Sequence, residues 1–349
     1  MADSLNIVGV MSGTSMDGLD FILCEFKEVE NTVSYEVLAQ QEVSFNNSLL
    51  QGLKSCRSMS ALELSYLDNE LGEFIGRKVR EFVSGLNMKV DYVASHGHTV
   101  FHNPKQGLTK QIGSGAEIAI HSGLKSIVDF RTNDVALGGQ GAPLVPIGDW
   151  NLFSEYDACL NLGGISNISL KSSKKAFDIS PCNLILNELV KKFDLAFDKG
   201  GELGRKGELN EELFEELNQL EFYHLNGPKS LGAEFLETSF YPILGKYQIK
   251  TIDKLTTVYH HIAFQVSKYL YSYKVLITGG GAHNSYLLEL FESYSGYKFE
   301  KADTDLINFK EAIIFAFMGF LRANNQENVN NLVTGSKQSN IGGAIYLPA

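Results

Sequence analysis

The chain has 349 residues, of which 44% are hydrophobic and 20% are charged, and its formal net charge is −11. This composition is typical of a globular protein, and the length is sufficient for two lobes that each enclose a core. The acidic balance argues against a general nucleic-acid-binding protein, which carries a basic surface. Nucleotides are not excluded, because a local phosphate site needs only backbone N–H donors and a metal.

The sequence lacks the features of membrane and secreted proteins. Its longest apolar run, residues 312–321, is far shorter than the ~20 residues of a membrane-spanning helix. The N-terminal residues MADSLN contain no basic segment followed by an apolar one. The cysteines do not have paired metal-ligand spacing; they are Cys24, Cys56, Cys159 and Cys182. We therefore expect a cytoplasmic protein with reduced thiols and with no membrane or nucleic-acid partner.

An early motif, GVMSGTSMDGLD at residues 9–20, lies between two apolar, strand-like runs. This pattern predicts a β-hairpin with a functional turn. Gly13 and Gly18 allow the backbone to approach a ligand closely. Thr14 and Ser15 add hydroxyl donors, and successive backbone N–H groups in such a turn form an anion-binding concavity. The motif therefore predicts a phosphate site, and an ordinary surface hairpin is the alternative.

Two carboxylates belong to the same motif, Asp17 and Asp20. A carboxylate beside a phosphate repels it unless a cation lies between them. Magnesium suits that position, because it binds through one or two carboxylates together with substrate phosphates.

Residues 60–83 have apolar side chains at helical spacing, and a short strand is predicted at 92–95. The segment HGHTVFH follows and contains His96, His98 and His102. Its glycine and β-branched residues favour extended or loop structure, and it contains no cysteine or acidic residue to complete a zinc site. The histidines therefore fit hydrogen-bonding roles or sugar contacts better than a metal site.

A strand-like segment at residues 126–130 leads into a glycine-rich run, LGGQGAPLVP, which we expect to mark the crossing between two lobes. Arg131 follows the strand, and its planar guanidinium is suited to a bidentate contact with a carboxylate. A structural ion pair with Asp134 is the alternative.

Residues 158–170 repeat the design of the early motif: an apolar strand, a polar glycine turn and a second strand. The expected ligand contacts of this turn are Asn161, Gly163, Gly164 and Asn167. Asp178 then lies at a strand end before an apolar helical run, where it is either a catalytic group or a helix cap.

The C-terminal part combines helical and glycine-rich patterns. Apolar spacing predicts helices at residues 256–272 and 309–322. A strand at residues 274–278 runs into Gly279, Gly280 and Gly281, which allow the backbone to lie flat against a planar group. The spacing does not match the dinucleotide-binding fingerprint, and the chain contains no GxxxxGK[ST] motif. Any ATP is therefore expected to bind through hairpin turns.

The motif MSGTSMDGLD closely resembles the signature of anhydro-N-acetylmuramic acid kinases, bacterial cell-wall recycling enzymes of the actin, Hsp70 and hexokinase-like superfamily. Further matching segments follow in order along nearly the whole chain: ASHGHTVFHNP (94–104), QIGSGAEIA (111–119), DFRTNDVALGGQGAPLVP (129–146), NLGGISNIS (161–169), FDISPCN (177–183), PKSLGAEF (228–235), ITGGGAHN (277–284) and IGGAIY (341–346).

The resemblance implies an α/β, two-lobed actin-like ATPase (ribonuclease H-like) fold with a ligand cleft between the lobes. The expected lobes are residues 1–128 and 129–349, and the last helix is able to pack back on the first lobe. The resemblance also implies a homodimer and the cofactors ATP and Mg²⁺. The implied reaction is ATP-dependent hydrolysis of the 1,6-anhydro bond of anhydro-N-acetylmuramic acid with phosphorylation of the 6-oxygen.

The resemblance also implies roles for single residues. Asp178 corresponds to the catalytic base, and Asp17 to a magnesium contact, direct or through water. The ATP-binding positions are Gly13, Thr14, Ser15, Met16, Asp17, Gly18, Leu19, Asp20, Gly163, Gly164, Asn167, Gly279, Gly280 and Gly281. The substrate-binding positions are His96, His98, Asp129, Arg131, Gln140 and Glu311. Arg131 would contact the lactyl carboxylate of the sugar.

One segment departs from the family pattern FDTGPGN. This chain retains Asp178 but has Ile179, Ser180 and Cys182 at the positions of a threonine and two glycines. Two alternatives to the implied function therefore remain: another sugar kinase of the same fold, and a nucleotide-binding regulator that has lost catalysis.

Overall fold

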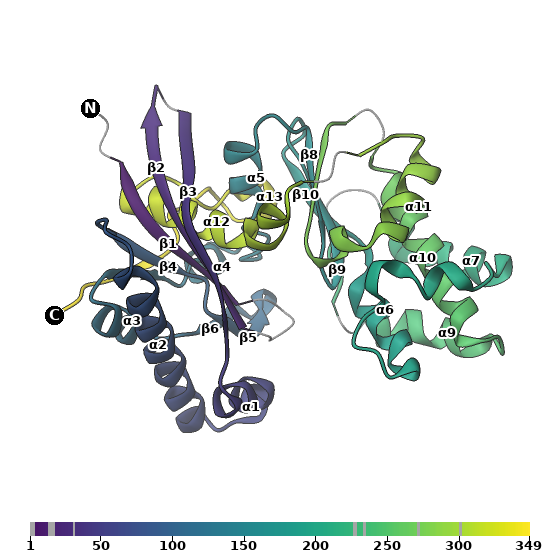
Figure 1. The fold of residues 1–349 in the computed structure, drawn as a ribbon, viewed down its shortest axis with the longest axis horizontal. Coiled ribbons are helices and arrows are strands. Elements are labelled where there is room, and N and C mark those ends of the chain that lie inside the picture. The colour runs from purple at the N-terminus through teal and green to yellow at the C-terminus, as the bar shows by residue number, and fades with distance from the viewer. Residues whose placement is uncertain are drawn as a thin grey trace. The chain divides into compact units, whose positions relative to one another are not determined.

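The computed structural model describes residues 4–12, 18–30, 32–225, 229–232, 235–270, 273–299 and 302–349. The chain forms two compact α/β units (Figure 1). Unit 1 consists of residues 1–154 and 309–349, and unit 2 of residues 155–308.

Unit 1 contains a six-stranded sheet with the order β12-β7-β4-β1-β2-β3. Its strands are β1 (Leu5–Ser12), β2 (Gly18–Val29), β3 (Thr32–Ser44), β4 (Tyr92–Ser95), β7 (Lys125–Val128) and β12 (Ala344–Tyr346). The first three strands are antiparallel neighbours, which confirms the predicted pairing of the early hairpin. β1, β4 and β7 are parallel, and β12 is antiparallel to β7. A separate two-stranded sheet joins β5 (His98–Asn103) to β6 (Leu108–Ile112).

Helices cover both faces of the large sheet of unit 1. They are α1 (Asn47–Ser55), α2 (Ala61–Ser84), α3 (Gly115–Ser122), α4 (Thr132–Ala136), α5 (Pro146–Leu152), α12 (Thr304–Ala323) and α13 (Asn331–Thr334). One face packs its apolar side chains against α1, α2 and α3. Ser60 and Glu63 begin α2 with a capping box, which satisfies free backbone donors at its start.

Helix α12 lies against the other face of this sheet. Its Gly319 approaches side chains of β1, β4 and β7, and Gly9 of β1 lies under its backbone. A Cβ atom at Gly9 would collide with the carbonyl oxygen of Ala312. The long apolar run of α12 therefore reflects burial on the sheet. Among the described residues, no helix combines the length and hydrophobicity that crossing a membrane requires.

Unit 2 contains a four-stranded sheet with the order β10-β9-β8-β11. Its strands are β8 (Ala158–Leu162), β9 (Ile165–Leu170), β10 (Lys175–Pro181) and β11 (Val275–Thr278). β10, β9 and β8 are antiparallel neighbours, and β11 is parallel to β8. Unit 1 has the same pattern, with β3, β2 and β1 antiparallel and β4 parallel to β1. This repeated topology confirms the predicted α/β, actin-like fold.

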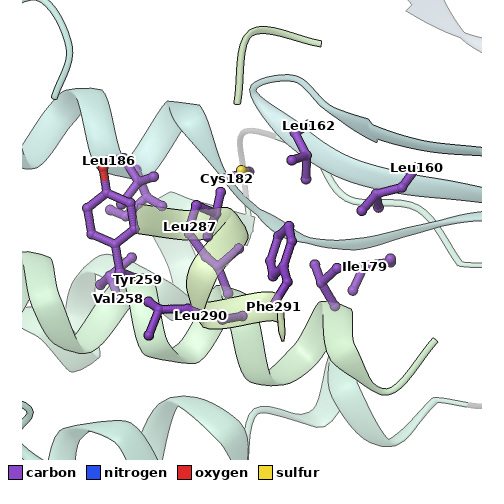
Figure 2. Close-up of a cluster of buried hydrophobic side chains, with 14 of the residues drawn as sticks. Leu160, Leu162, Ile179, Cys182, Leu186, Val258, Tyr259, Leu287, Leu290 and Phe291 are labelled. Carbon is purple, nitrogen blue, oxygen red and sulfur yellow. The ribbon is translucent and has the colours of Figure 1, made fainter. Parts of the chain in front are cut away.

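The helices of unit 2 pack on one face of its sheet. They are α6 (Asn183–Val190), α7 (Glu211–Asn218), α9 (Tyr241–Lys246), α10 (Thr251–Ser267) and α11 (Ser285–Ser295), with a π-helix at Leu236–Phe240 and short 3₁₀ turns at Glu221–His224 and Gly280–His283. Figure 2 shows Leu160 and Leu162 of β8 facing Leu287 and Phe291 of α11, with Tyr259 of α10 nearby. The opposite face of the sheet carries the polar side chains of Asn161, Asn167 and Asp178 together with the buried Cys159 and Leu276.

The unit boundaries differ from the expected division after residue 128. Asp134 accepts hydrogen bonds from Thr334 and Asn340, which ties α4 to the C-terminal segment of unit 1. Asp149 of α5 forms a buried ion pair with Lys310 of α12, 2.9 Å long. These long-range contacts keep residues 129–154 in unit 1, and α12 returns to the same unit.

Candidate active site

The candidate residues of unit 1 gather where its parallel strands end. Ser12 ends β1, His96 directly follows β4, and Asp129 directly follows β7. The carboxyl ends of parallel strands meet at one edge of a sheet, which is the usual ligand position in open α/β sheets. Residues 13–17, which include the predicted contacts Gly13, Thr14, Ser15, Met16 and Asp17, lie outside the described residues.

His96 and Arg131 are in direct contact. The Nε and Nη2 atoms of Arg131 lie 3.0 and 2.9 Å from His96 Nε2. An arginine only donates, so Nε2 is the acceptor and Nδ1 carries the proton, which it donates to the Gly97 carbonyl at 3.0 Å. Burial, with the charge of Arg131, holds the pKa of His96 well below its usual range. His96 is therefore a neutral, buried acceptor that orients the guanidinium.

Arg131 keeps unused donors. Its Nη1 donates to the Gly141 carbonyl at 2.6 Å, so contacts within the described residues engage three of its five N–H groups and leave two. Burial lowers its pKa to about 10, and Glu311 opposes this shift, so the side chain is protonated at neutral pH. The alternative prediction was an ion pair between Arg131 and Asp134. Among the described residues, Asp134 instead accepts hydrogen bonds from Gly141 N, Thr334 and Asn340.

The other predicted substrate residues occupy varied environments. His98 is buried, and its Nδ1 lies 3.5 Å from Ser12 Oγ. Asp129 has a left-handed backbone, and its Oδ1 accepts from the backbone and hydroxyl of Thr132. Gln140 is exposed and donates its backbone N–H to the Thr334 carbonyl. In the described part of the chain, no group of three metal-ligating side chains is arranged to hold a metal ion.

Carboxylates concentrate at the start of β2. Asp20 pairs directly with Glu42 of β3. Burial, with the charges of Glu42 and Glu311, raises the pKa of Asp20 to about 6. Burial also raises the pKa of Glu311, whereas Lys310 and Arg131 oppose that shift. The ionised Asp20 is therefore disfavoured in the folded protein unless a cation offsets the charge.

Replacing Asp20 by Asn is expected to stabilise the protein at neutral pH. Folding raises the pKa of Asp20 from 3.8 to about 6. The contribution of Asp20 to the free energy of unfolding is therefore intact below pH 3.8 and is lost as the pH rises through 6. The amide avoids this loss, so the gain in melting temperature should grow between about pH 4 and about pH 8. Melting curves of both proteins without nucleotide or magnesium measure it. A gain that is the same at all pH values would contradict this assignment.

In unit 2, four polar residues form a row across the sheet. Asp178 of β10 pairs with Asn167 of β9, Asn167 pairs with Asn161 of β8, and Asn161 pairs with Thr278 of β11. Directly paired residues point to the same face of a sheet. The adjacent residues Leu160, Leu162, Ile168 and Ile277 point to the opposite, helix-covered face. The row therefore lies on the face that these helices leave uncovered.

Both glycine turns of unit 2 lie beside this row. Gly279 has φ +81°, and a Cβ atom there would lie 2.5 Å from Asn161 Oδ1, so the turn packs directly on the asparagine. The Gly164 carbonyl accepts from the backbone N–H groups of Cys182 and Leu184. The FDISPCN segment therefore packs on the Gly163–Gly164 turn in spite of its departure from the family pattern.

Asp178 lies within β10, and the helix-cap alternative is wrong. Cys182 occupies the N-cap position of α6, without a side-chain cap. The Asp178 Oδ2 atom accepts from Leu231 N at 2.8 Å and from Ser230 Oγ at 3.2 Å. Burial raises the pKa of Asp178, and these two hydrogen bonds oppose the shift.

Two residues of this region were not assigned from the sequence. Thr278 is buried, and within the described residues its hydroxyl has no hydrogen-bond partner. Ser230 lies in a segment that matches the family, but it is 52 positions from Asp178 along the chain, so no local pattern indicates their contact. The alignment of Thr278 with Asn161 depends on strand register, for which the sequence carried no direct signal.

The chain is similar to one protein family over nearly its whole length. The model of the family described as anhydro-N-acetylmuramic acid kinase matches residues 5–348. The anhydro-N-acetylmuramic acid kinase of Caldanaerobacter subterraneus subsp. tengcongensis is 31% identical, covering 98% of this chain and 96% of the relative. That of Bacillus thuringiensis subsp. konkukian is 32% identical, covering 98% and 99%.

Among solved structures, the activator of the 2-hydroxyisocaproyl-CoA dehydratase from Clostridium difficile with bound ADPNP is 12% identical. The match covers 92% of this chain and 97% of that chain, with a TM-score of 0.43. The matches to the kinase sequences extend over nearly the whole chain. The chain belongs to the anhydro-N-acetylmuramic acid kinase family.

Proposed function

We propose that this protein uses ATP and water to convert 1,6-anhydro-N-acetylmuramic acid to N-acetylmuramic acid 6-phosphate, a step in peptidoglycan recycling. Family membership over the whole chain supports the reaction. The single structural observation that carries the proposal is the Asp178 carboxylate, held at one oxygen in the polar row of the unit 2 sheet. It is suited to act as a general base, because burial raises its pKa towards neutrality.

Asp178 starts the reaction by accepting a proton from water as that water attacks the anomeric carbon. The new bond to the water oxygen forms as the bond from the anomeric carbon to the bridging 6-oxygen breaks, through an oxocarbenium-like transition state. The 6-oxygen takes the electron pair of the broken bond and accepts the γ-phosphoryl group of ATP, releasing ADP. Phosphoryl transfer depends mainly on positioning and charge neutralisation.

We propose that the glycine turns of unit 2 hold the nucleotide. Gly163 and Gly164 lie beside the polar row, Asn167 belongs to it, and Gly279 opens the turn before α11. The backbone N–H groups of such turns suit phosphate oxygens.

Magnesium would neutralise the phosphate charge. Asp20 is suited to contact this ion, because burial and the nearby carboxylates disfavour its negative charge unless a cation is bound. Mg²⁺ binds through one or two carboxylates together with phosphates and waters. Asp17 is the second carboxylate that we propose.

We propose that Arg131 binds the lactyl carboxylate of the sugar through its two remaining N–H groups. Replacing Arg131 by Lys removes the planar fork and should raise KM for the sugar about 10- to 100-fold, as expected for loss of a charged hydrogen bond. The corresponding anhydro-sugar without the lactyl ether is the matched control, because its KM should change little. Equal losses for both sugars would contradict this contact.

A labelling experiment tests the reaction. The protein is incubated with ATP and the anhydro-sugar in water enriched in oxygen-18, and the product is analysed by mass spectrometry. One heavy oxygen is expected at the anomeric position and none in the phosphate. A phosphorylated product that retains the anhydro ring would indicate an ordinary sugar kinase, and bound ATP without turnover would indicate a regulator.

We further propose that the protein acts as a cytoplasmic homodimer, as the family resemblance suggests. Sedimentation equilibrium tests the dimer, and fractionation of the source cells tests the compartment. A monomer at all concentrations tested would overturn the first part.

A further inference from the structure

The carboxylate of Asp178 is held on one side only. Leu231 N and Ser230 Oγ both donate to Oδ2, at 2.8 and 3.2 Å. The backbone N–H of Asp178 donates to the Lys229 carbonyl at 2.9 Å. Within the described residues, Oδ1 has no hydrogen-bond partner. Residues 229–231 therefore run beside β10 and grip its acidic side chain at a single oxygen.

This segment is itself anchored to the core of unit 2. Lys229 Nζ donates to the Phe222 carbonyl at 2.9 Å and lies 4.5 Å from the Phe222 ring centroid. The next residue, Tyr223, has its hydroxyl 2.8 Å from His261 Nε2 and 3.4 Å from Ser180 Oγ. Leu231 is buried, with 8% of its surface exposed. The contacts of Lys229 and Tyr223 therefore tie residues 229–231 to α10 and to β10.

The anchor does not change with physiological pH. His261 Nδ1 lies 2.8 Å from Asn218 Oδ1, which also accepts from Gln265, so Nδ1 donates and Nε2 accepts from Tyr223. Burial lowers the pKa of His261 to about 3. The imidazole is therefore neutral at neutral pH, and the hydrogen-bond directions are fixed.

We infer that Ser230 is a positioning residue for Asp178: with Leu231 N it holds Oδ2, so that Oδ1 alone faces the proton that the reaction removes. This inference rests on the proposed function, in which Asp178 is the base. Two donors on one oxygen prevent rotation of the carboxylate, and a correctly oriented base needs no rearrangement in the transition state. The same donors stabilise the ionised form, which is the form that accepts a proton.

Replacement of Ser230 by Ala tests this role in the full-length chain. Loss of one hydrogen bond to a charged group should lower kcat about 10-fold or more and leave KM for ATP unchanged. The acidic limb of the pH–rate profile should move to higher pH, because the lost bond lowered the pKa of Asp178. Within the described residues, the neighbouring groups of this carboxylate include Asn167, which is neutral, and Lys229, whose ammonium is held at Phe222.

Ser230→Thr retains a hydroxyl and should restore both kcat and the acidic limb, and Ser239→Ala is the control within the same region. Equal losses in the alanine and threonine variants, with an unmoved acidic limb, would show a merely structural role and overturn the inference. Unchanged kinetics in Ser230→Ala would also overturn it.

A second measurement separates this inference from the proposed function. If the wild-type protein does not convert the sugar, the proposed function fails, but the pKa of Asp178 is still measurable by carbon-13 NMR of labelled aspartate. Asp178→Asn identifies the resonance by its loss. A higher pKa in Ser230→Ala than in the wild type supports the grip on Oδ2, and equal values contradict it.

Discussion

Replacing Asp178 by Asn is expected to abolish turnover while leaving nucleotide binding nearly intact. The amide oxygen accepts the hydrogen bonds from Leu231 N and Ser230 Oγ, so the local structure is retained. The amide nitrogen then replaces the atom that takes the proton. Loss of a positioned general base costs about 10²- to 10⁴-fold in rate. Release of ADP in the presence of the anhydro-sugar measures this effect, and calorimetry measures ATP affinity.

The result has a clear contrary outcome. Near-normal kinase activity of Asp178→Asn would remove this carboxylate from the role of base. A matched loss of ATP affinity and turnover would instead indicate a structural role at the polar row. Asp194→Asn is a suitable control, because Asp194 is an exposed residue of a turn after α6.

Replacing Lys310 by Met is expected to lower the free energy of unfolding by about 3–5 kcal/mol, since it removes the cation that is paired with the buried Asp149 carboxylate. The Lys310 ammonium lies 2.9 Å from Asp149 Oδ1, and the two side chains expose only 3% and 5% of their surface. The pair joins α12 to α5 within unit 1. Urea denaturation followed by circular dichroism measures the change.

A surface ion pair provides the control. Arg77 and Glu73 of α2 expose 64% and 42% of their side chains, so Arg77→Met should cost less than about 1 kcal/mol. The double variant Lys310→Met with Asp149→Leu removes both charges and should recover much of the loss. A loss below about 1 kcal/mol in Lys310→Met alone would show that the pair contributes little.

Local patterns predicted the local structure well. The amphipathic helix expected at residues 60–83 is α2 (Ala61–Ser84), and the glycine turn between apolar runs gives β8 and β9. Helical spacing and turn chemistry act over a few residues, so one sequence is sufficient to identify them. The segment at residues 274–278 also forms a strand, β11, that runs into the glycine turn.

Long-range contacts could not be predicted in the same way. The expected alternative partner of Arg131 was Asp134, but Asp134 is bonded by Thr334 and Asn340, about 200 residues along the chain. Because of the same contacts, unit 1 extends to residue 154 and does not end at residue 128 as expected. The packing of His96 on Arg131 likewise depends on the adjacency of β4 and β7 in the sheet. Such contacts follow from topology, which no local pattern determines.

The arrangement of the two units along the chain has a consequence for biosynthesis. Unit 2 is one continuous stretch, whereas unit 1 needs α12 and β12, which come after it. Because domains fold as they leave the ribosome, unit 2 can be complete while the six-stranded sheet still lacks its last strand and the helix over one face. In the nascent protein, the apolar surface around Gly9 therefore stays exposed until α12 is made. We expect chaperones to bind the newly made chain at that surface.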